Sequence, residues 1–389
     1  MRSLEIFSGA GGLAKGLERA GFRHVAFVES NRDAYASLSA NFEKSRIFFG
    51  DIKNFDFDGS GVVDLVAGGP PCQPFSLGGK HKADHDDRDM FPYAIRAIEK
   101  LTPQAFVFEN VKGLLRTNFS DYFEYIILRL TFPDFSAKPS MDWRDHLAKL
   151  RMITKSSYTG TRYDVQSKLI NAADYGVPQT RERVVIVGTR SDIGKSWSFP
   201  EPTHSEDRLL WEMYVTGEYW RRHKISISHC PHAAASAEEK RTILKSRFGL
   251  FEPNLHPWRT VRDELSDIPD PREKHRFADH LFRDGARSYA GHTGSDFDWP
   301  AKTIKAGGHG VPGGENMIRY PDGTVRYFTV FEAKRIQTFP EDFVIKGSWG
   351  EAMRQIGNAV PVLLAETIGN HLAKTLNGKL LPSPLHGDD

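Results

Sequence analysis

Residues Gly68 to Ser76 read Gly-Gly-Pro-Pro-Cys-Gln-Pro-Phe-Ser and directly follow the strand-like run from Val62 to Ala67. Prolines fix φ and remove backbone donors, so this stretch predicts a stiff loop at the carboxyl end of a strand. That end is where open α/β sheets bind their ligands. Cys72 lies within the loop. On this stretch alone we interpret it either as a nucleophile with a reachable thiolate or as an inert buried thiol.

A second motif stands near the N-terminus. Leu4 to Phe7 is a short strand-like run, Ser8 to Gly12 reads Ser-Gly-Ala-Gly-Gly, and Leu13 to Ala20 is typical of a helix. A strand, a glycine turn and a helix in this order predict a nucleotide-binding turn, in which a helix N-terminus faces the ligand. The spacing is Gly-x-Gly-Gly and not Gly-x-Gly-x-x-Gly, which disfavours a dinucleotide-dependent dehydrogenase.

Acidic residues follow three further predicted strands. The strands and the residues after them are Val25 to Val28 with Glu29, Ile47 to Phe49 with Gly50-Asp51-Ile52, and Ala105 to Phe108 with Glu109-Asn110-Val111. Such folds bind a ribose diol at the position of Glu29 and an adenine edge near that of Asp51. Glu109 is expected close to Cys72, because carboxyl ends of neighbouring strands meet at one edge of the sheet.

The alternation of apolar runs and helical segments predicts an α/β domain of the Rossmann-like kind over residues 1–190. From residue 191 the alternation stops and histidines, prolines and aromatic residues become frequent. We therefore expect a smaller, irregular domain at 191–345. The segment 346–389 contains an amphipathic helix from Val362 to Leu376 and is expected to return to the first domain.

The composition is that of a globular protein: 389 residues, 39% hydrophobic, 26% charged, with a formal net charge of +2. So small a net charge does not indicate binding to nucleic acid or to an anionic membrane, although a basic cleft can exist in a protein whose total charge is balanced. No apolar run reaches the roughly 18 residues of a membrane span, and the first predicted strand leaves no room for a signal peptide. The chain is therefore expected to bind no membrane. Its two cysteines are too few for a disulfide scaffold, so we expect a cytoplasmic protein.

Three other stretches invite a functional interpretation. His81 with His85, and His229-Cys230-Pro231-His232, lack further ligands at metal-site spacing, so no metal is predicted. The cluster Arg221-Arg222-His223-Lys224 is interpreted either as a solvated helix face or as a phosphate contact. Lys305 to Gly314 is a glycine-rich loop that can lie close to a ligand.

Taken in order, these motifs resemble the DNA (cytosine-5) methyltransferases of the bacterial restriction-modification type, over nearly the whole chain. The matching segments are Phe7-Ser-Gly-Ala-Gly-Gly12, Glu29, Gly50-Asp-Ile52, Gly69-Pro-Pro-Cys-Gln-Pro-Phe-Ser76, Glu109-Asn-Val111, Gln179-Thr-Arg-Glu-Arg183, Arg335-Ile-Gln-Thr-Phe-Pro340 and Gln355-Ile-Gly-Asn-Ala-Val-Pro361. Each motif alone is modest evidence, whereas the ordered set is highly specific. The resemblance implies a Rossmann-like S-adenosylmethionine-dependent domain and a smaller target-recognition domain. Double-stranded DNA would lie in the cleft, with the target cytosine flipped out.

The resemblance also implies a covalent mechanism. Cys72 would add to C6 of the cytosine while Glu109 bonds or protonates N3, so that no full charge builds on the ring. C5 then takes the methyl group, and loss of the C5 proton releases the enzyme. Arg183 would hold O2, the carbonyl of Pro70 would read the exocyclic amine, and Arg181 would support the loop or a phosphate. Splitting one hard step into two easier ones is the advantage of covalent catalysis.

The same resemblance assigns binding residues. Those expected around S-adenosylmethionine, and its product S-adenosylhomocysteine, are Phe7, Gly9, Gly11, Gly12, Glu29, Asp51, Ile52, Pro70 and Asn358. Those expected to contact DNA are Pro70, Gln73, Ser76, Lys305 and Arg319, with Arg326 as a further candidate. The loop from Leu77 to Met90 would close over DNA, with Gln73 or a loop residue filling the space that the cytosine leaves.

Three positions depart from the pattern of the family. Ser30 stands where a bulkier residue often covers the adenine, and Asp89 replaces a glycine after the loop. Phe331 stands where an arginine commonly precedes the glutamate. None of the three belongs to the predicted chemistry of Cys72 and Glu109.

Two alternatives remain. A tRNA cytosine-5 methyltransferase of the same superfamily would use the same nucleophile and acid, but the long region from Ser191 to Tyr327 favours DNA. A catalytically inactive DNA-binding relative is disfavoured, because Cys72, Glu109 and Arg183 are all present. We expect a monomer. The recognition sequence is not readable, since direct readout depends on how side chains meet the groove, and a restriction endonuclease acting on the same site stays open.

Overall fold

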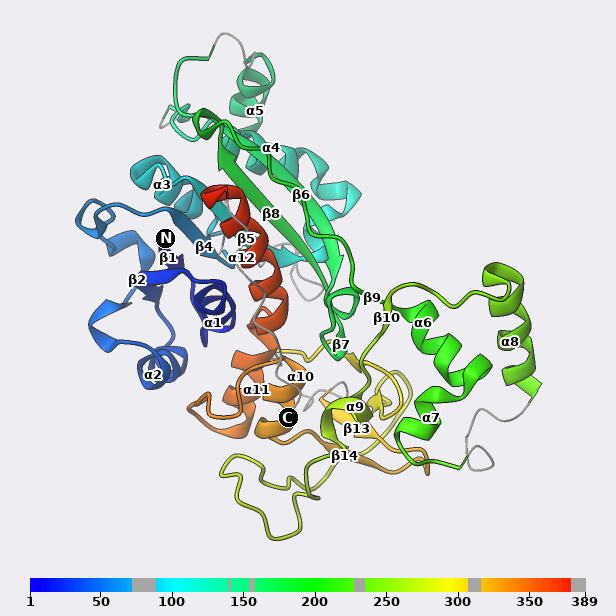
Figure 1. Ribbon diagram of the computed structural model, residues 1–389. Helices are drawn as coiled ribbons and strands as arrows, with labels where there is room; N and C mark the ends of the chain where they lie inside the picture. Colours follow the sequence, from blue (N-terminus) through cyan, green and yellow to red (C-terminus); the bar gives the residue numbers. More distant parts are fainter. Residues whose placement is uncertain (72–88, 139–140, 154–157, 227–234, 307–315, 379–389) are drawn as a thin grey trace. The chain divides into compact units, whose positions relative to one another are not determined.

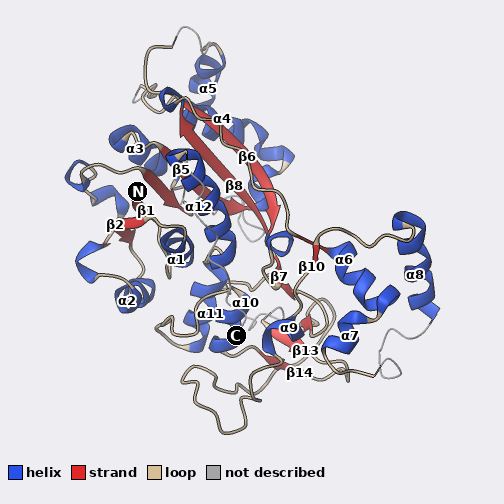
Figure 2. Cartoon of the chain, in the orientation of Figure 1, coloured by secondary structure: helices blue, strands red, loops and turns tan. Residues whose placement is uncertain are grey.

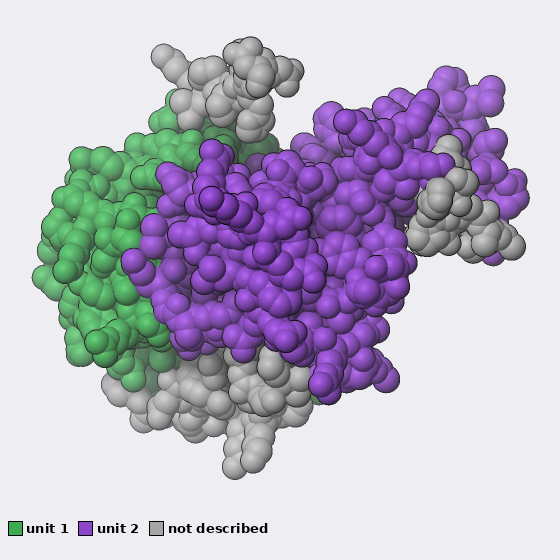
Figure 3. All heavy atoms as spheres, turned by 90° about the horizontal axis from the view of Figure 1, so that it is seen from below, with its two compact units in different colours: residues 1–170, 182–200, 365–389 green, residues 171–181, 201–364 purple. Residues whose placement is uncertain are grey.

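The computed structural model describes residues 1–71, 89–138, 141–153, 158–226, 235–306 and 316–378. The chain forms two compact units: unit 1 comprises residues 1–170, 182–200 and 365–389, and unit 2 comprises residues 171–181 and 201–364 (Figure 3). These bounds differ from the predicted domains at residues 171–181, 191–200 and 346–364. Residues 191–200 stay with unit 1 because Trp197 packs on His371 and its carbonyl accepts from Gln166 Nε2.

Unit 1 alternates strands and helices (Figure 1, Figure 2). Its strands are β1 (Arg2–Ile6), β2 (Arg23–Glu29), β3 (Ile47–Phe49), β4 (Leu65–Gly68), β5 (Ala105–Val111), β6 (Tyr163–Asn171) and β8 (Glu182–Arg190). Its helices are α1 (Gly12–Arg19), α2 (Arg32–Asn41), α3 (Phe91–Leu101), α4 (Ser120–Thr131), α5 (Trp143–Arg151) and most of α12 (Val362–Asn377). Short 3-10 turns occupy η1 (Lys44–Arg46), η2 (Ile52–Asn54), η3 (Asp58–Ser60), η5 (Lys112–Leu115), η6 (Thr117–Phe119) and η8 (Ser191–Ile193).

The seven strands of unit 1 form one mixed sheet in the order β3-β2-β1-β4-β5-β8-β6. Strands β1 to β5 pair in parallel, and β8 runs antiparallel to β5. From β1 the order proceeds outward to β3 on one side and from β4 to β5 on the other. The carboxyl ends of β1 and β4, where Ile6 pairs with Gly68, therefore flank the point where such sheets bind ligands. The predicted α/β fold is confirmed.

Helices cover both faces of this sheet. Successive residues of a strand face opposite sides, and β2 shows the consequence. Val28 packs in a core with residues of α3 and α4, whereas Phe27 packs with Ala14 of α1 and Leu38 of α2. On the side of α1, a side-chain carbon at Gly369 of α12 would lie 2.8 Å from the Cβ of Ala20, so glycine allows this close approach. The result is a three-layer unit.

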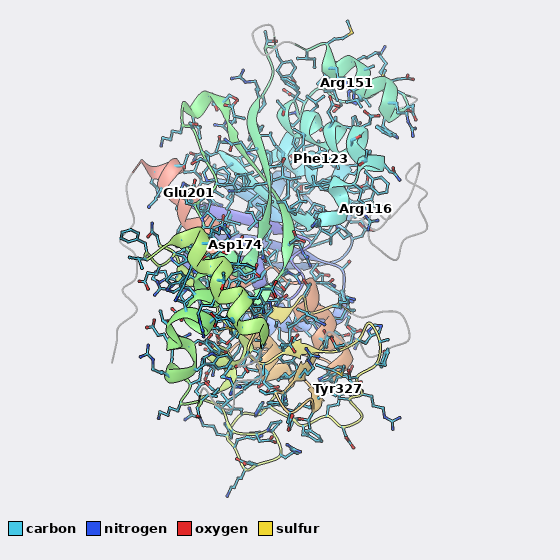
Figure 4. The ribbon with its side chains drawn as sticks, turned by 90° about the vertical axis from the view of Figure 1, so that its right-hand side faces the viewer. Arg116, Phe123, Arg151, Asp174, Glu201 and Tyr327 are labelled. Atoms are coloured by element: carbon cyan, nitrogen blue, oxygen red, sulfur yellow. The ribbon has the colours of Figure 1, made fainter. Side chains whose placement is uncertain are left out.

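Helix α5 is attached to α4 by charge as well as by packing. Arg151, labelled in Figure 4, places Nη2 2.8 Å from Asp121 Oδ1 and 2.6 Å from Glu124 Oε2 of α4. These groups are exposed, so the pairs add little free energy of folding. Burial carries more of the attachment, because Leu147 and Leu150 of α5 are almost completely buried.

Unit 2 has strands of only two or three residues, and most of its helices are short. Its strands are β7 (Gln179–Thr180), β9 (His204–Ser205), β10 (His256–Pro257), β11 (Ser295–Asp296), β12 (Ala301–Lys302), β13 (Met317–Arg319) and β14 (Val325–Tyr327). Its helices are η7 (Ala172–Tyr175), α6 (Glu206–Trp211), η9 (Glu212–Thr216), α7 (Glu218–Arg222), α8 (Ala235–Phe248), α9 (Val261–Leu265), α10 (Val330–Ile336) and α11 (Trp349–Asn358). The irregular architecture indicated by the composition is present. Across the described ranges of both units, no helix combines the length and apolarity needed to cross a membrane.

The core of unit 2 accounts for one departure from the family pattern. Phe331 is 1% exposed, and its ring stacks on that of Phe277 with the centroids 4.3 Å apart. The following residue, Glu332, is also buried and binds Arg326 through two hydrogen bonds of 2.7 and 2.5 Å. The aromatic residue at position 331 therefore serves packing in this chain.

The basic cluster of residues 221–224 is tied to acids of the same unit. Arg222 Nη1 lies 2.9 Å from Glu212 Oε2, and His223 Nε2 lies 2.8 Å from Asp263 Oδ1. Burial opposes ionisation of Asp263, but hydrogen bonds from His223 and Thr260 hold its pKa at about 2. The structure thus favours a structural role for Arg222 and His223 over a phosphate contact.

Candidate active site

The carboxyl ends of β1 and β4 come unusually close. A side-chain carbon at Gly68 would lie 2.3 Å from the carbonyl oxygen of Ile6, so glycine is required there. Strand β4 ends at Gly68, because Pro70 and Pro71 have no N–H with which to continue a ladder. The nucleophile predicted just beyond, Cys72, lies outside the described residues, as do Gln73, Ser76 and most of the predicted closing loop.

Glu109 and Arg183 meet in unit 1. Arg183 Nε lies 2.7 Å from Glu109 Oε1, and the two side chains are only 13% and 12% exposed. The contact is an ion pair, because no described residue donates a hydrogen bond of good geometry to Oε1. Arg183 Nη1 donates to the carbonyl of Glu182 at 2.8 Å. The two charges predicted to hold the ring of the substrate are thus together at one sheet edge.

Asn110, next to the predicted acid, holds the loop that follows β4. Its Nδ2 donates to the carbonyl oxygen of Pro70 at 2.9 Å, and its Oδ1 accepts from the N–H of Val111 at 2.9 Å. A carbonyl oxygen has two lone pairs, so that of Pro70 can still accept a second hydrogen bond. The motif Glu109-Asn-Val111 contains Asn110 but predicts no role for it, because its partner is 40 residues away in the chain.

Arg181 is an anchor inside unit 2. Its side chain is fully buried, and Nη2 donates to the carbonyls of Gly357 at 2.8 Å and Ala359 at 3.0 Å. Gln337 Nε2 donates to the carbonyl of Ile356 at 2.6 Å, on the same turn. The burial and these contacts fit the predicted support of a backbone segment better than a phosphate contact, and the place of Arg181 among the catalytic residues stays a prediction.

The segment that Arg181 holds is the end of α11, where Asn358 is the last helical residue and is exposed. Asn358 belongs to unit 2, whereas the other predicted cofactor residues belong to unit 1. Its assignment to the cofactor therefore stays a prediction.

The glycine turn after β1 has the backbone of a ligand-binding turn. Gly9 has φ of +54° and Gly11 has φ of +90°, and no atom lies within 4 Å of a side-chain carbon built on Gly9. Phe7 has φ of +53°, a conformation that costs a non-glycine residue about 1–2 kcal/mol. Helix α1 starts at Gly12 without a side-chain cap. Its first N–H groups can therefore face an anionic or polar ligand.

Glu29 closes this turn from the end of β2. Its Oε2 accepts from the N–H of Gly9 and its Oε1 from the N–H of Asn31, both at 2.7 Å. The side chain is 8% exposed and is fixed by these bonds. A carboxylate offers about four lone-pair sites, so Glu29 can accept hydroxyl donors in addition. The geometry fits the predicted ribose contact.

Asp51 and Ile52 follow β3 and have opposite environments. Asp51 is exposed, and its Oδ1 accepts from the N–H of Lys53 at 2.9 Å. Ile52 is 3% exposed and packs in the core of unit 1. The carboxylate of Asp51 is thus accessible to an adenine edge, whereas the side chain of Ile52 offers a ligand almost no surface. Ser30, which departs from the family pattern, is exposed on the preceding strand end.

Glu5, which sequence analysis passed over, is a buried acid beneath the glycine turn. It is 1% exposed on β1. Burial raises the pKa of Glu5 well above its ordinary value; the N–H of Ala14 opposes this rise and the charge of Glu29 adds to it. A neutral Glu5 leaves Glu29 as the one charge of the pair. A glutamate between Leu4 and Ile6 in a buried strand was the available signal.

The candidate DNA-contacting residues of unit 2 differ in how far their side chains are already paired with other protein groups. Arg326 is committed to the buried Glu332 and to Tyr320 Oη, so it is a structural residue. Arg319 is 41% exposed and pairs with Asp296. Lys305 is exposed, and its backbone N–H donates to Asn316 Oδ1 at 3.1 Å. Lys305 and Arg319 keep accessible charge, and their contact with DNA stays a prediction.

Asp89, the departure that follows the predicted loop, is an anchor. Its Oδ1 accepts from the N–H of Phe91 at 3.1 Å, and its Oδ2 accepts from Tyr122 Oη. Next to it, the N–H of Met90 donates to the carbonyl of Pro71 at 3.1 Å. The aspartate thus fixes the start of α3, where a glycine would add freedom.

No set of three His, Cys, Asp or Glu side chains with the arrangement of metal ligands occurs among the residues that the structure describes. His81, His85 and residues 229–232, which the sequence analysis weighed, lie outside these residues.

Comparisons with known proteins agree with this architecture. The family model described as C-5 cytosine-specific DNA methylase matches residues 1–141 and 144–374. The type II methyltransferase M.NgoMIV of Neisseria gonorrhoeae is 30% identical over 378 residues, which cover 96% of this chain and 97% of the relative. M.PspPI of Psychrobacter sp. strain TA137, also a type II methyltransferase, is 31% identical over 376 residues, with 96% and 79% covered.

Two solved structures show the same fold. The Dnmt2 methyltransferase of S. pombe superposes with a TM-score of 0.58 at 16% identity, covering 97% of this chain and 99% of that one. A DNMT2 mutant from Spodoptera frugiperda superposes with a TM-score of 0.55 at 17% identity, covering 96% and 99%. The sequence matches go further than fold. On their evidence this chain, a methyltransferase by its motifs, belongs to the family of C-5 cytosine-specific DNA methylases.

Proposed function

We propose that the chain methylates a cytosine at C5 within a specific DNA sequence, through a covalent bond between Cys72 and C6 of the flipped-out base. The Glu109–Arg183 pair carries this proposal, because it places an acid and a cation within 2.7 Å of each other in unit 1. Gly69, at the start of the nucleophile loop, is adjacent: a side-chain carbon there would lie 3.7 Å from Glu109 Oε2. Two residues after Pro70, the sequence supplies the thiol.

The cofactor of the proposed reaction is S-adenosylmethionine, which supplies a methyl group as an electrophile when bound. The residues that fit it in unit 1 are the turn from Phe7 to Gly12, Glu29 and Asp51. The positive-φ turn and the uncapped helix start leave backbone N–H groups available for the ligand. Glu29 would accept from the ribose hydroxyls. We retain Pro70 and Asn358 as proposed contacts.

The chemistry proposed for the cytosine ring follows from where each proton and electron pair moves. The Cys72 thiolate forms a bond to C6, and the electron pair of the ring double bond shifts towards C5 and N3. Glu109 Oε2 gives or shares a proton at N3, because Oε1 faces Arg183. Once C5 carries the methyl group, a water molecule accepts the C5 proton and the C5–H electron pair restores the double bond between C5 and C6. The C6–sulfur bond breaks with its electrons returning to Cys72 as thiolate, and the proton on N3 returns to Glu109.

Arg183 is proposed to hold O2 of the cytosine. Its Nε faces Glu109 and its Nη1 donates to a backbone carbonyl, while Nη2 makes no hydrogen bond to another described residue. Nη2 is thus the group that we assign to O2. The carbonyl of Pro70 would accept from the exocyclic amine, which distinguishes cytosine from a ring with an oxygen there.

We assign target recognition to unit 2, with Lys305 and Arg319 as contacts, and Gln73 and Ser76 on the nucleophile loop. The family description and the type II naming of the relatives support double-stranded DNA as substrate. They also support a restriction-modification setting, in which an endonuclease would cut the same sequence. We propose that the chain acts as a monomer. Methylation of tRNA is the second candidate, because the same acid and nucleophile would serve it.

The experiment is conversion sequencing of DNA from a methylation-free host that expresses the chain, with Cys72→Ser as the matched variant. Protected cytosines in one short sequence context, absent with the variant, are the expected result. A folded chain that binds S-adenosylmethionine but protects no DNA cytosine would overturn the DNA proposal. Methylated cytosine in tRNA from the same cells would then establish the second candidate.

A further inference from the structure

We infer that Asn110 is a positioning residue for methyl transfer, in that it sets the carbonyl of Pro70 in place beside Glu109. This inference rests on the proposed function. Strands β4 and β5 pair in parallel up to Gly68 and Phe108. Beyond that pair the ladder stops, because Pro70 and Pro71 lack an N–H. The Asn110 side chain supplies the next link, with Nδ2 donating to Pro70 O at 2.9 Å.

Both ends of the Asn110 amide are occupied by backbone. Oδ1 accepts from the N–H of Val111 at 2.9 Å, so the amide cannot flip without losing both bonds. The side chain is 6% exposed. A buried, doubly bonded amide is a rigid spacer between the two strand ends, and truncating it leaves an unpaired polar group.

The position of this spacer gives it a role beyond stability. Glu109 precedes Asn110 directly, and Cys72 follows Pro70 by two residues in the chain. The residues on either side of the nucleophile loop are joined as well, because the Met90 N–H donates to the Pro71 carbonyl at 3.1 Å. Asn110 thus fixes the backbone from which the nucleophile loop departs, relative to the strand that carries the acid. Misplacement of reacting groups by about 1 Å is enough to cost on the order of 100-fold in rate.

The same strand offers a matched control at its opposite end. Gln104, just before β5, donates from Nε2 to Oδ1 of Asp64, just before β4, at 2.8 Å. Both side chains therefore link the β4 and β5 segments. They differ in that Asn110 lies at the carboxyl edge with Glu109, whereas Gln104 lies at the amino edge.

The test compares Asn110→Leu, Asn110→Asp and Gln104→Leu with the unchanged full chain. Leucine keeps the size and loses both bonds; aspartate keeps the acceptor for Val111 and loses the donor. We expect both Asn110 variants to lower kcat for DNA methylation roughly 10- to 100-fold. The KM and Kd for S-adenosylmethionine should stay within about threefold, as uniform binding is not affected. Gln104→Leu should keep kcat within about threefold.

Equal losses in kcat for Asn110→Leu and Gln104→Leu would overturn the inference, because they would show a general loss of stability. Normal kcat in Asn110→Asp would overturn it as well. A DNA-inactive unchanged chain would instead contradict the proposed function. The failure of one idea is thus distinguishable from the failure of the other.

Discussion

Arg183 Nε lies 2.7 Å from Glu109 Oε1 because β5 and β8 pair antiparallel in one register. In that register Val111 is opposite Arg183, and Glu109 is opposite Val185. Residues two apart on a strand share a face, so Glu109 and Arg183 are diagonal neighbours on one side of the sheet. Two motifs separated by more than seventy residues thus become one catalytic arrangement.

Glu109→Gln tests the acid. The amide keeps the size of the side chain but cannot transfer a proton to N3, so we expect methyl transfer to slow by about two orders of magnitude or more. The measurement is single-turnover transfer of labelled methyl groups to DNA. Glu182→Gln, which removes an exposed partner of Lys112 from the neighbouring strand β8, is the control and should keep its rate. An unchanged rate in Glu109→Gln would contradict the assignment to N3.

Arg183→Lys tests whether charge alone is sufficient. Lysine keeps the charge but loses the planar fork that serves Glu109 and O2 together, so we expect kcat to fall roughly tenfold or more. Arg190→Lys lies at the other end of β8, where Arg190 Nε binds Asp192 at 2.7 Å, and it should keep normal kcat. Normal kcat in Arg183→Lys would show that the fork geometry is not used.

Glu29 is expected to control cofactor affinity. Its two oxygens bind the N–H groups of Gly9 and Asn31, so Glu29→Ala removes both the ribose acceptor and the support of the turn. Titration calorimetry should show S-adenosylmethionine binding weakened by roughly tenfold or more. Glu18→Ala, an exposed acid of α1 that pairs with Lys15, should bind normally. Equal affinity in both variants would argue against the assignment.

Thr338 stores backbone strain in unit 2. It has φ of +58°, and its Oγ1 accepts from the N–H of Leu363 at 2.9 Å. Thr338→Ala and Thr338→Gly both lose this bond, but alanine alone keeps the strain of a Cβ at positive φ. We expect the glycine variant to be more stable than the alanine variant by about 1 kcal/mol. Urea unfolding measures the difference, and a more stable alanine variant would contradict it.

We expect His204 to make the stability of unit 2 depend on pH. Burial, with the nearby charges of His256 and Arg259, lowers the pKa of His204 to about 4. Unfolding restores a pKa near 6.5, so between these values the unfolded chain binds more protons. Stability is therefore lost as the pH falls from about 6.5 towards 4. The urea midpoint of unfolding should fall when the pH is lowered from about 7 to about 5, and it should fall more in the unchanged chain than in His204→Gln. Equal drops would contradict the assignment.

Local patterns in the sequence were enough for most of unit 1. The apolar run before the glycine turn, and the alternation that follows it, predict β1 to β5, since propensity and periodicity are local properties. The predicted helix from Leu13 to Ala20 agrees with α1 (Gly12–Arg19) to within one residue at each end. The antiparallel direction of β8 was not predictable, because strand direction depends on long-range pairing.

The site shows the same division between local and long-range information. Glu29 and Glu109 were found from their places after strands. The partners of Asn110 and Arg181 were not, because Pro70 and Gly357 lie far away in the chain. From the sequence, Arg181 is expected to support the loop or a phosphate, and only the fold shows that its guanidinium is buried against carbonyls. Sequence motifs therefore identify chemistry better than they separate reacting residues from supporting ones.

The most direct test of the central claim uses a DNA duplex with the recognised cytosine replaced by 5-fluorocytosine. Fluorine takes the place of the proton that must leave C5, so a covalent enzyme–DNA adduct should persist after methyl transfer. We predict a denaturation-resistant complex with the unchanged chain, attached at Cys72 by peptide mass spectrometry, and none with Cys72→Ser. Methylation of normal DNA with no such adduct, or an adduct at another residue, would contradict the proposed role of Cys72.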